Sequence, residues 1–243
     1  MKQTFLDHIS NEKISVVEPL INKVIGFYRE NLELVRTDDV QSTFAREIKD
    51  QEGKIVPLGK IQLTTKGNIE EGLVHELLHL ALPLKTGLYT MEKTRQDPQN
   101  FFAVYNNMAE HDLILPDFLE MGYHLETFLA GGFTIDYKRE SKEAMGWWIY
   151  EYIRNVITKN HLGSVGAKQS EKAIKDIRQY GVQFYPRLDN SFKTVYEWIK
   201  SRKKMEPKDH PQMMRALIVL LNLGTPGKYL APDGDGALKE VSF

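Results

Sequence analysis

Apolar residues near the start of the chain recur at helical spacing. Between residues 13 and 31 they stand three and four positions apart, which places them on one side of a helix. The pattern therefore predicts an amphipathic amino-terminal helix. Its apolar positions are Val17, Leu20, Ile21, Val24, Ile25 and Tyr28.

The following segment, residues 41–65, has the pattern of short strands. Apolar and polar residues alternate over 60–65, and the segments 42–48 and 54–58 flank a turn-like Asp-Gln-Glu-Gly sequence. We expect a small antiparallel sheet here. Pro57 has no backbone N–H to donate, which indicates an edge position or the end of a strand.

The next helix has a defined start. Asn68 can accept a hydrogen bond as the cap, and Glu71 stands three residues later, in the capping-box position, directly before an apolar run. Pro83 and Gly87 are expected to close this helix.

A further helix is predicted after Asp97-Pro98, because proline is favoured at the first helical position. We expect Pro116 to end or kink it, since proline breaks the hydrogen bonding of a helix interior.

Beyond the Gly131-Gly132 pair the chain is predicted to be helical, over about 138–159, 168–180, 191–203 and 211–223. The predicted fold class is α+β: an amino-terminal helix, a small antiparallel sheet and two further helices, followed by an all-helical carboxy-terminal region. The predicted domains are a core over 1–130, a helical region over 131–224 and a flexible tail over 225–243.

Composition narrows the chemistry that the chain can perform. Among its 243 residues there is no cysteine, which excludes disulfide scaffolds, thiolate metal sites and thiol nucleophiles. Any metal must therefore be bound by His, Asp or Glu.

Charge and hydropathy narrow the choice of partners. The net charge is -1, so no global field favours nucleic acid or an anionic membrane. The longest strongly apolar stretch, residues 216–221, is too short to span a bilayer, and the first residues do not resemble a signal peptide. We expect a soluble, cytoplasmic protein without nucleic-acid or membrane partners.

One motif carries chemical content: His75-Glu76-Leu77-Leu78-His79, an H-E-x-x-H sequence inside the capped helix. Residues four apart differ by about 40° around a helix and their Cβ atoms lie about 5–6 Å apart, so both imidazoles can bind one ion. Glu76 points about 100° away from His75. On an otherwise apolar helix, unpartnered groups of this kind would cost several kcal/mol. The helix is therefore predicted to hold a metal site.

Residues 72–81, Gly-Leu-Val-His-Glu-Leu-Leu-His-Leu-Ala, resemble the active-site helix of the zincin metallopeptidases. The resemblance, which covers about residues 41–125, implies a zinc ion (Zn2+) on His75 and His79 and Glu76 as the general base for a zinc-bound water that hydrolyses a peptide bond. It also implies a peptide or protein substrate held along a sheet edge, for which residues 60–65 are the candidate. The metzincin extension is absent, because Leu82 and Lys85 stand where Gly and the third His are needed.

A catalytic zinc needs a third protein ligand. Glu110, thirty-one residues after His79, resembles the third ligand of the gluzincins, and Asn106, one turn earlier, could orient its carboxylate. The partner acid usual in gluzincins is missing, because Ile114 occupies its position. His111 is the second choice for the ligand. The remaining candidates are Asp112, Glu120 and His124.

Several alternatives stay open at the level of sequence. Tyr105, His111, Tyr123 and His124 are all candidates for stabilising an oxyanion. The chain could also be a non-catalytic metal-binding or degenerate zincin that serves as an interaction module, or a helical binding protein with a coincidental motif. The sequence does not indicate an oligomeric state.

Overall fold

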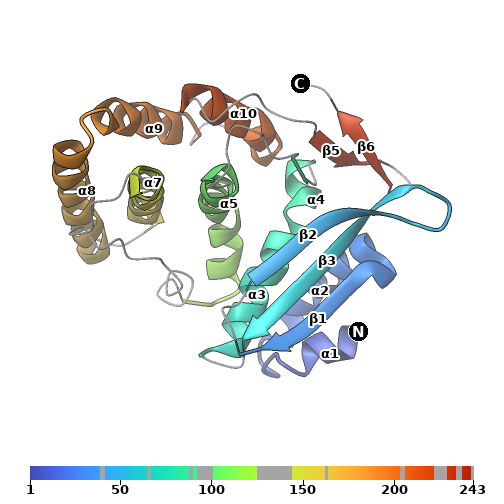
Figure 1. Cartoon of the computed structure of the whole chain (residues 1–243). Helices are drawn as coiled ribbons and strands as arrows, with labels where there is room; N and C mark the ends of the chain where they lie inside the picture. Colours follow the sequence, from blue (N-terminus) through green and yellow to red (C-terminus); the bar gives the residue numbers. More distant parts are fainter. Residues whose placement is uncertain are drawn as a thin grey trace. The chain divides into compact units, whose positions relative to one another are not determined.

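The chain is mixed α+β and mostly helical in the computed structural model, with small β-sheets (Figure 1). The structure describes residues 1–38, 42–64, 67–87, 90–91, 101–124, 144–161, 164–202, 206–221, 229–233 and 237–241. Contacts divide the chain into two compact units. The first comprises Met1–Glu92, Leu113–Gly131 and Gly227–Phe243, and the second Lys93–Asp112 and Gly132–Pro226.

The first unit contains a three-stranded sheet with strand order β1-β3-β2. The strands β1 (Leu32–Thr37) and β3 (Ile55–Thr64) are parallel, whereas β2 (Ser42–Lys49) and β3 are antiparallel. The prediction of a purely antiparallel sheet was therefore wrong. The prediction that residues 60–65 form an edge was also wrong, because 60–64 lie in the central strand, between β1 and β2.

The pairing of β3 explains how Pro57 is tolerated in the central strand. Its partner in β2 is Glu47, but the pairing of β3 with β1 begins only at Gly59. The part of β3 that contains Pro57 is thus paired with β2 alone in the described sheet. The missing N–H leaves no gap in a second ladder, and the edge character predicted for Pro57 holds locally.

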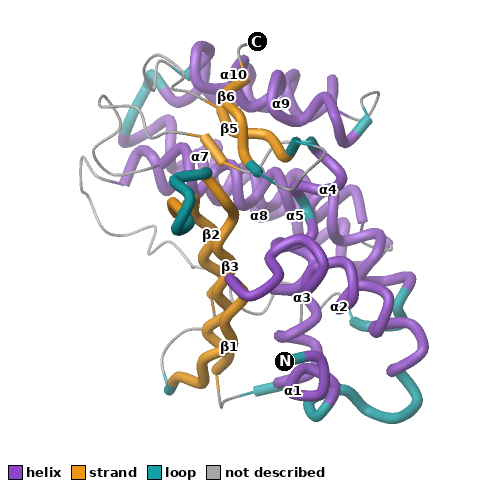
Figure 2. Tube along the Cα trace, turned by 90° about the vertical axis from the view of Figure 1, so that its right-hand side faces the viewer, coloured by secondary structure: helices purple, strands orange, loops and turns teal. Residues whose placement is uncertain are grey.

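Two helices cover one face of this sheet, α2 (Ile14–Tyr28) and α3 (Ile69–Ala81), as Figure 2 shows with the sheet viewed along its edge. The predicted apolar side of α2 is buried apart from Ile25, which is partly buried. The Tyr28 ring packs on Gly59, where an added Cβ would lie only 2.9 Å from a ring carbon. The Tyr28 hydroxyl donates to the Leu80 carbonyl at 3.2 Å. One tyrosine thereby fixes α2, β3 and α3 together.

The ends of α3 are as the sequence predicts. The Asn68 side chain accepts a hydrogen bond from the Glu71 amide at 3.2 Å and caps the helix. After Ala81 the chain forms the short helix α4 (Pro83–Thr86), which ends at Gly87 in the left-handed conformation.

The long helix α5 (Phe101–Glu120) continues past Pro116, so of the two predicted outcomes the end of the helix was wrong, and the kink stays a prediction. Proline at that position removes only one helical hydrogen bond, and its neighbours Ile114, Leu115 and Phe118 are buried in the core of the first unit. This burial outweighs the local cost. The predicted start at Asp97-Pro98 lies outside the described residues.

The end of α5 is held by a lysine from the start of the chain. The Nζ atom of Lys13 donates to the carbonyls of Met121 and Gly122 at 2.9 and 3.1 Å. A positive charge at this place also complements the carboxy-terminal end of the helix dipole. These contacts fix the carboxy-terminal end of α5 within the first unit.

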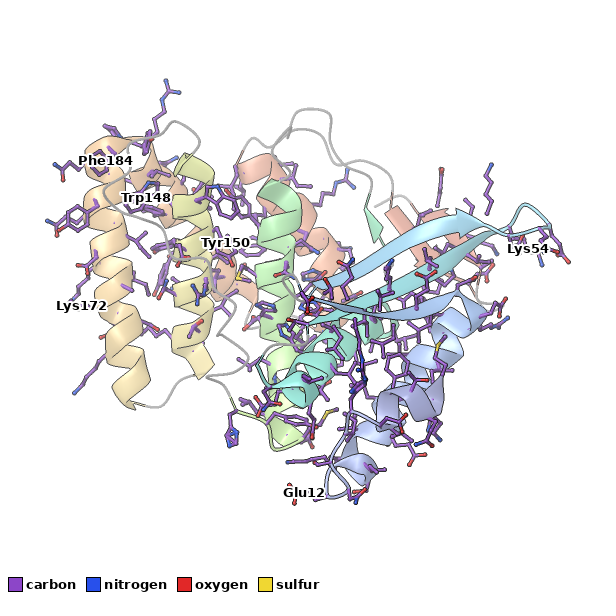
Figure 3. All side chains as sticks on the ribbon, turned by 60° about the horizontal axis from the view of Figure 1, so that its bottom comes forward. Glu12, Lys54, Trp148, Tyr150, Lys172 and Phe184 are labelled. Carbon is purple, nitrogen blue, oxygen red and sulfur yellow. The ribbon has the colours of Figure 1, made fainter. Side chains whose placement is uncertain are left out.

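The second unit has a core of helices rich in aromatic residues. Trp148 and Tyr152 on α7 are buried, and the Trp148 ring lies 6.5 Å from that of Phe184 on α8 (Figure 3). The four helices predicted after Gly132 are confirmed. They are α7 (Ala144–His161), α8 (Ser164–Phe184), α9 (Leu188–Arg202) and α10 (His210–Leu220).

The prediction that the chain forms only helices after Gly132 was wrong, because the predicted flexible tail, 225–243, contains two strands. The strands β5 (Tyr229–Pro232) and β6 (Leu238–Val241) pair with each other, and β5 pairs with β4 (Thr90–Met91). Next to the paired ends of these strands, the Asp233 side chain accepts a hydrogen bond from the Ala237 amide at 3.0 Å. The predicted domain boundaries near 130 and 224 lie outside the described residues.

The remaining elements are short: the helix α1 (Lys2–Leu6) and the 3-10 turns Arg29–Asn31 and Pro207–Asp209.

None of the described helices combines the length and the apolarity that a membrane span requires.

Candidate metal centre

The two motif histidines on α3 lie close together. The Nε2 atoms of His75 and His79 are 3.1 Å apart. Two nitrogens bound tetrahedrally to one zinc at about 2.0–2.1 Å would be separated by about 3.4 Å. The side chains are thus already close to the spacing that a shared ion requires, as the helical i, i+4 relation predicts.

A third imidazole joins this pair. His111 on α5 brings a ring nitrogen into the group, and the ligand atoms of His75, His79 and His111 all lie within 4.8 Å of one another. Each of the three side chains is partly buried. Three histidines that could hold a metal ion are therefore gathered at α3 and α5.

The packing of α5 explains why His111 takes this position. The His75 ring lies 6.5 Å from the ring of Phe118, which is fully buried. At 3.6 residues per turn, His111 is about 20° from Phe118 around the helix, whereas Glu110 is about 80° away. The face of α5 that meets His75 is thus the face that carries His111.

The electrostatics of His75 suit a metal ligand. Burial, and to a smaller extent the neighbouring His79, lower its pKa to about 3. The imidazole therefore stays neutral at physiological pH and keeps a nitrogen lone pair for coordination.

Glu76, the predicted general base, lies on α3 beside His75 and is only 7% exposed. The rest of the helix around it is apolar and buried, as in Leu77, Leu78 and Leu80. Burying a carboxylate among apolar side chains costs free energy unless polar or charged groups interact with it.

Glu110, the predicted third ligand, is engaged elsewhere. Its Oε1 atom accepts a hydrogen bond from the Asn106 side-chain amide at 2.5 Å, the contact that the sequence suggested. Glu110 is not among the described residues that form the three-ligand group, and the geometry favours His111 for that place.

The Asn106 amide has a second partner that the sequence did not indicate. The Nε2 atom of His210, at the start of α10, lies 3.0 Å from Asn106 Oδ1, and the His210 side chain is 5% exposed. The two residues are 104 positions apart, and no motif or spacing links them. Only the tertiary fold could show this contact.

The other candidates for the site have different partners. The Tyr105 hydroxyl donates to the Gly146 carbonyl at 3.0 Å. Tyr123 donates to Glu70 at 2.8 Å, and burial, followed by that hydrogen bond, raises the pKa of Tyr123 far above its usual value. These two tyrosines therefore have structural hydrogen bonds.

The remaining third-ligand candidates also lie outside the group. His124 is 3.5 Å from Glu71 and largely exposed, so it contacts the amino-terminal end of α3. Asp112 and Glu120 are likewise not members of the group that the described side chains form.

Comparison with known proteins adds no assignment to this geometry. The chain matches no protein-family model, no curated protein and no solved structure.

Proposed function

We propose that this chain is a zinc-dependent metallopeptidase. The observation that supports the proposal best is the convergence of three imidazoles, from His75, His79 and His111, two of them on the helix that also carries Glu76. The H-E-x-x-H spacing accounts for two of these histidines, and the packing of α5 accounts for the third.

The donor set suits zinc in a catalytic role. Imidazole nitrogens are good ligands for zinc, and three protein ligands leave a fourth tetrahedral position for water or substrate. A structural zinc site would instead use four protein ligands, most often with thiolates, and the chain has no cysteine.

A zinc ion held by these histidines would act as a Lewis acid and lower the pKa of a coordinated water toward about 7. Glu76 then has the task of a general base: a carboxylate oxygen accepts the proton of the attacking water and later transfers it to the amine nitrogen that leaves. The apolar neighbours of Glu76 limit the access of bulk water and strengthen its electrostatic interaction with the reacting groups.

The sheet offers an edge for an extended peptide. Strand β3 is central and cannot serve, which leaves β1 and β2 as the edges of the described sheet. Of these two strands, β2 makes the more extensive contacts with α3. We therefore assign the substrate to the outer edge of β2, where main-chain hydrogen bonds would add it as a further strand.

A second candidate function is a metal-binding module without catalysis. The observation in its favour is the low exposure of Glu76, 7%, because a buried carboxylate is less accessible to substrate. Both candidates require the metal, and only the peptidase requires turnover.

Cleavage of a peptide library by the zinc-loaded chain tests the proposal. We expect cleavage products by mass spectrometry, their loss after treatment with a chelator, and their return when zinc but not magnesium is added back. A zinc-loaded chain that cleaves no peptide would reject the peptidase and leave the metal-binding module.

A further inference from the structure

A chain of polar side chains runs from α10 to the part of α5 that carries His111. The Nε2 atom of His210 lies 3.0 Å from Asn106 Oδ1, and Asn106 Nδ2 lies 2.5 Å from Glu110 Oε1. Glu110 directly precedes His111. All four residues belong to the second unit.

The chemistry of the three groups fixes the direction of both hydrogen bonds. A carboxylate can only accept, so the Asn106 amide must turn its NH2 group to Glu110. Its carbonyl oxygen then faces His210, which must donate, and the ring therefore carries a proton on Nε2. Each of these three side chains, Glu110, Asn106 and His210, thus determines the orientation of the next.

Burial makes this arrangement costly to break. His210 is 5% exposed, and its neighbours Pro211 and Met214 are also buried. A buried donor or acceptor that loses its partner keeps the full penalty of desolvation, because no water can replace the partner. Loss of the Asn106 carbonyl would therefore leave the buried His210 donor without this partner, so α10 constrains the orientation of the Asn106 amide.

We infer that His210 is a positioning residue of the metal centre, acting through Asn106 and Glu110 on the turn of α5 that carries His111. This inference rests on the proposed function, because it requires His111 to bind the metal. It gives the carboxy-terminal helices a role: they hold one ligand in the orientation that coordination requires. Loss of a partner bonded directly to a ligand typically changes metal affinity by about 10- to 100-fold, and His210 acts at a greater remove, so the lower end of this range is expected.

The test is zinc affinity, measured by competition with a chromogenic chelator on the full chain. We expect His210→Leu to weaken zinc binding by about 10-fold, the lower end of the range for partners bonded directly to a ligand. His210→Gln, whose side-chain NH2 can donate to Asn106, should recover most of the loss. Asn106→Leu should weaken binding by a similar factor, and the double variant should add little, because the two residues act in series.

A matched control separates positioning from general destabilisation. Asn155 on α7 belongs to the same unit and donates to the Glu151 carbonyl at 2.8 Å, but it is not part of the chain of hydrogen bonds that ends at Glu110. Asn155→Leu should lower the midpoint of urea unfolding and leave zinc affinity unchanged.

Three results would overturn the inference. Wild-type affinity in His210→Leu would remove the role of His210, and an equal loss of affinity in Asn155→Leu would reduce that role to stability. A wild-type chain that binds no zinc would reject the proposed function as well, so the two failures can be told apart.

Discussion

Replacement of Glu76 by Gln is expected to leave zinc content at the wild-type level and to lower peptide hydrolysis by about 10²- to 10⁴-fold. The amide has nearly the size of the carboxylate but cannot accept a proton, and general base catalysis contributes a factor of this order. The motif histidines on either side of Glu76 in the sequence are unchanged, so the metal should remain. The measurement is the rate of cleavage of a peptide identified in the library, with metal content determined on the same sample.

Glu71→Gln provides the matched control for this variant. Glu71 also lies on α3 and is 6% exposed, but it contacts His124 rather than the metal group. Its replacement should preserve hydrolysis. If Glu76→Gln retained the wild-type rate, or if Glu71→Gln lost as much activity, Glu76 would not be the general base.

The second large effect concerns the third ligand. His111→Ala should weaken zinc binding by more than about 100-fold, because it removes an atom that coordinates the ion. This loss exceeds the one expected when only a hydrogen-bond partner of a ligand is removed. Glu110→Ala should cost less, since Glu110 acts through its hydrogen bond with Asn106. Both affinities follow from competition with a chelator, and wild-type secondary structure by circular dichroism serves as the control for folding.

The reverse order of these two affinities would contradict the assignment. It would make Glu110 the third ligand, as the resemblance to gluzincins implies, and the carboxylate would have to leave Asn106 to reach the metal. The two adjacent residues therefore test which face of α5 the site uses.

Helices could be predicted from the sequence because their evidence is local. The 3.6-residue period of α2 and the cap at Asn68 depend on neighbours within a few positions, and both were confirmed. The sheet was harder, because strand order and direction depend on pairing between distant segments. Strand β1 was missed altogether, and its parallel pairing with β3 placed residues 60–64 at the centre of the sheet.

The candidate site divides in the same way. His75 and His79 could be paired from sequence because four residues on a helix fix their spacing. The choice between Glu110 and His111 could not be made from sequence, because it depends on the rotation of α5, which the packing of Leu115 and Phe118 determines. The contact of His210 with Asn106 has no sequence signal at all.

The measurement that tests the central claim most directly is the metal content of the purified, untagged chain beside His79→Ala, by elemental analysis after loosely bound metal is removed. Three converging imidazoles predict about one zinc per wild-type chain and a loss of that zinc in the variant. No zinc in the wild type after zinc is offered back, or equal zinc in both proteins, would contradict the site and the function proposed for it.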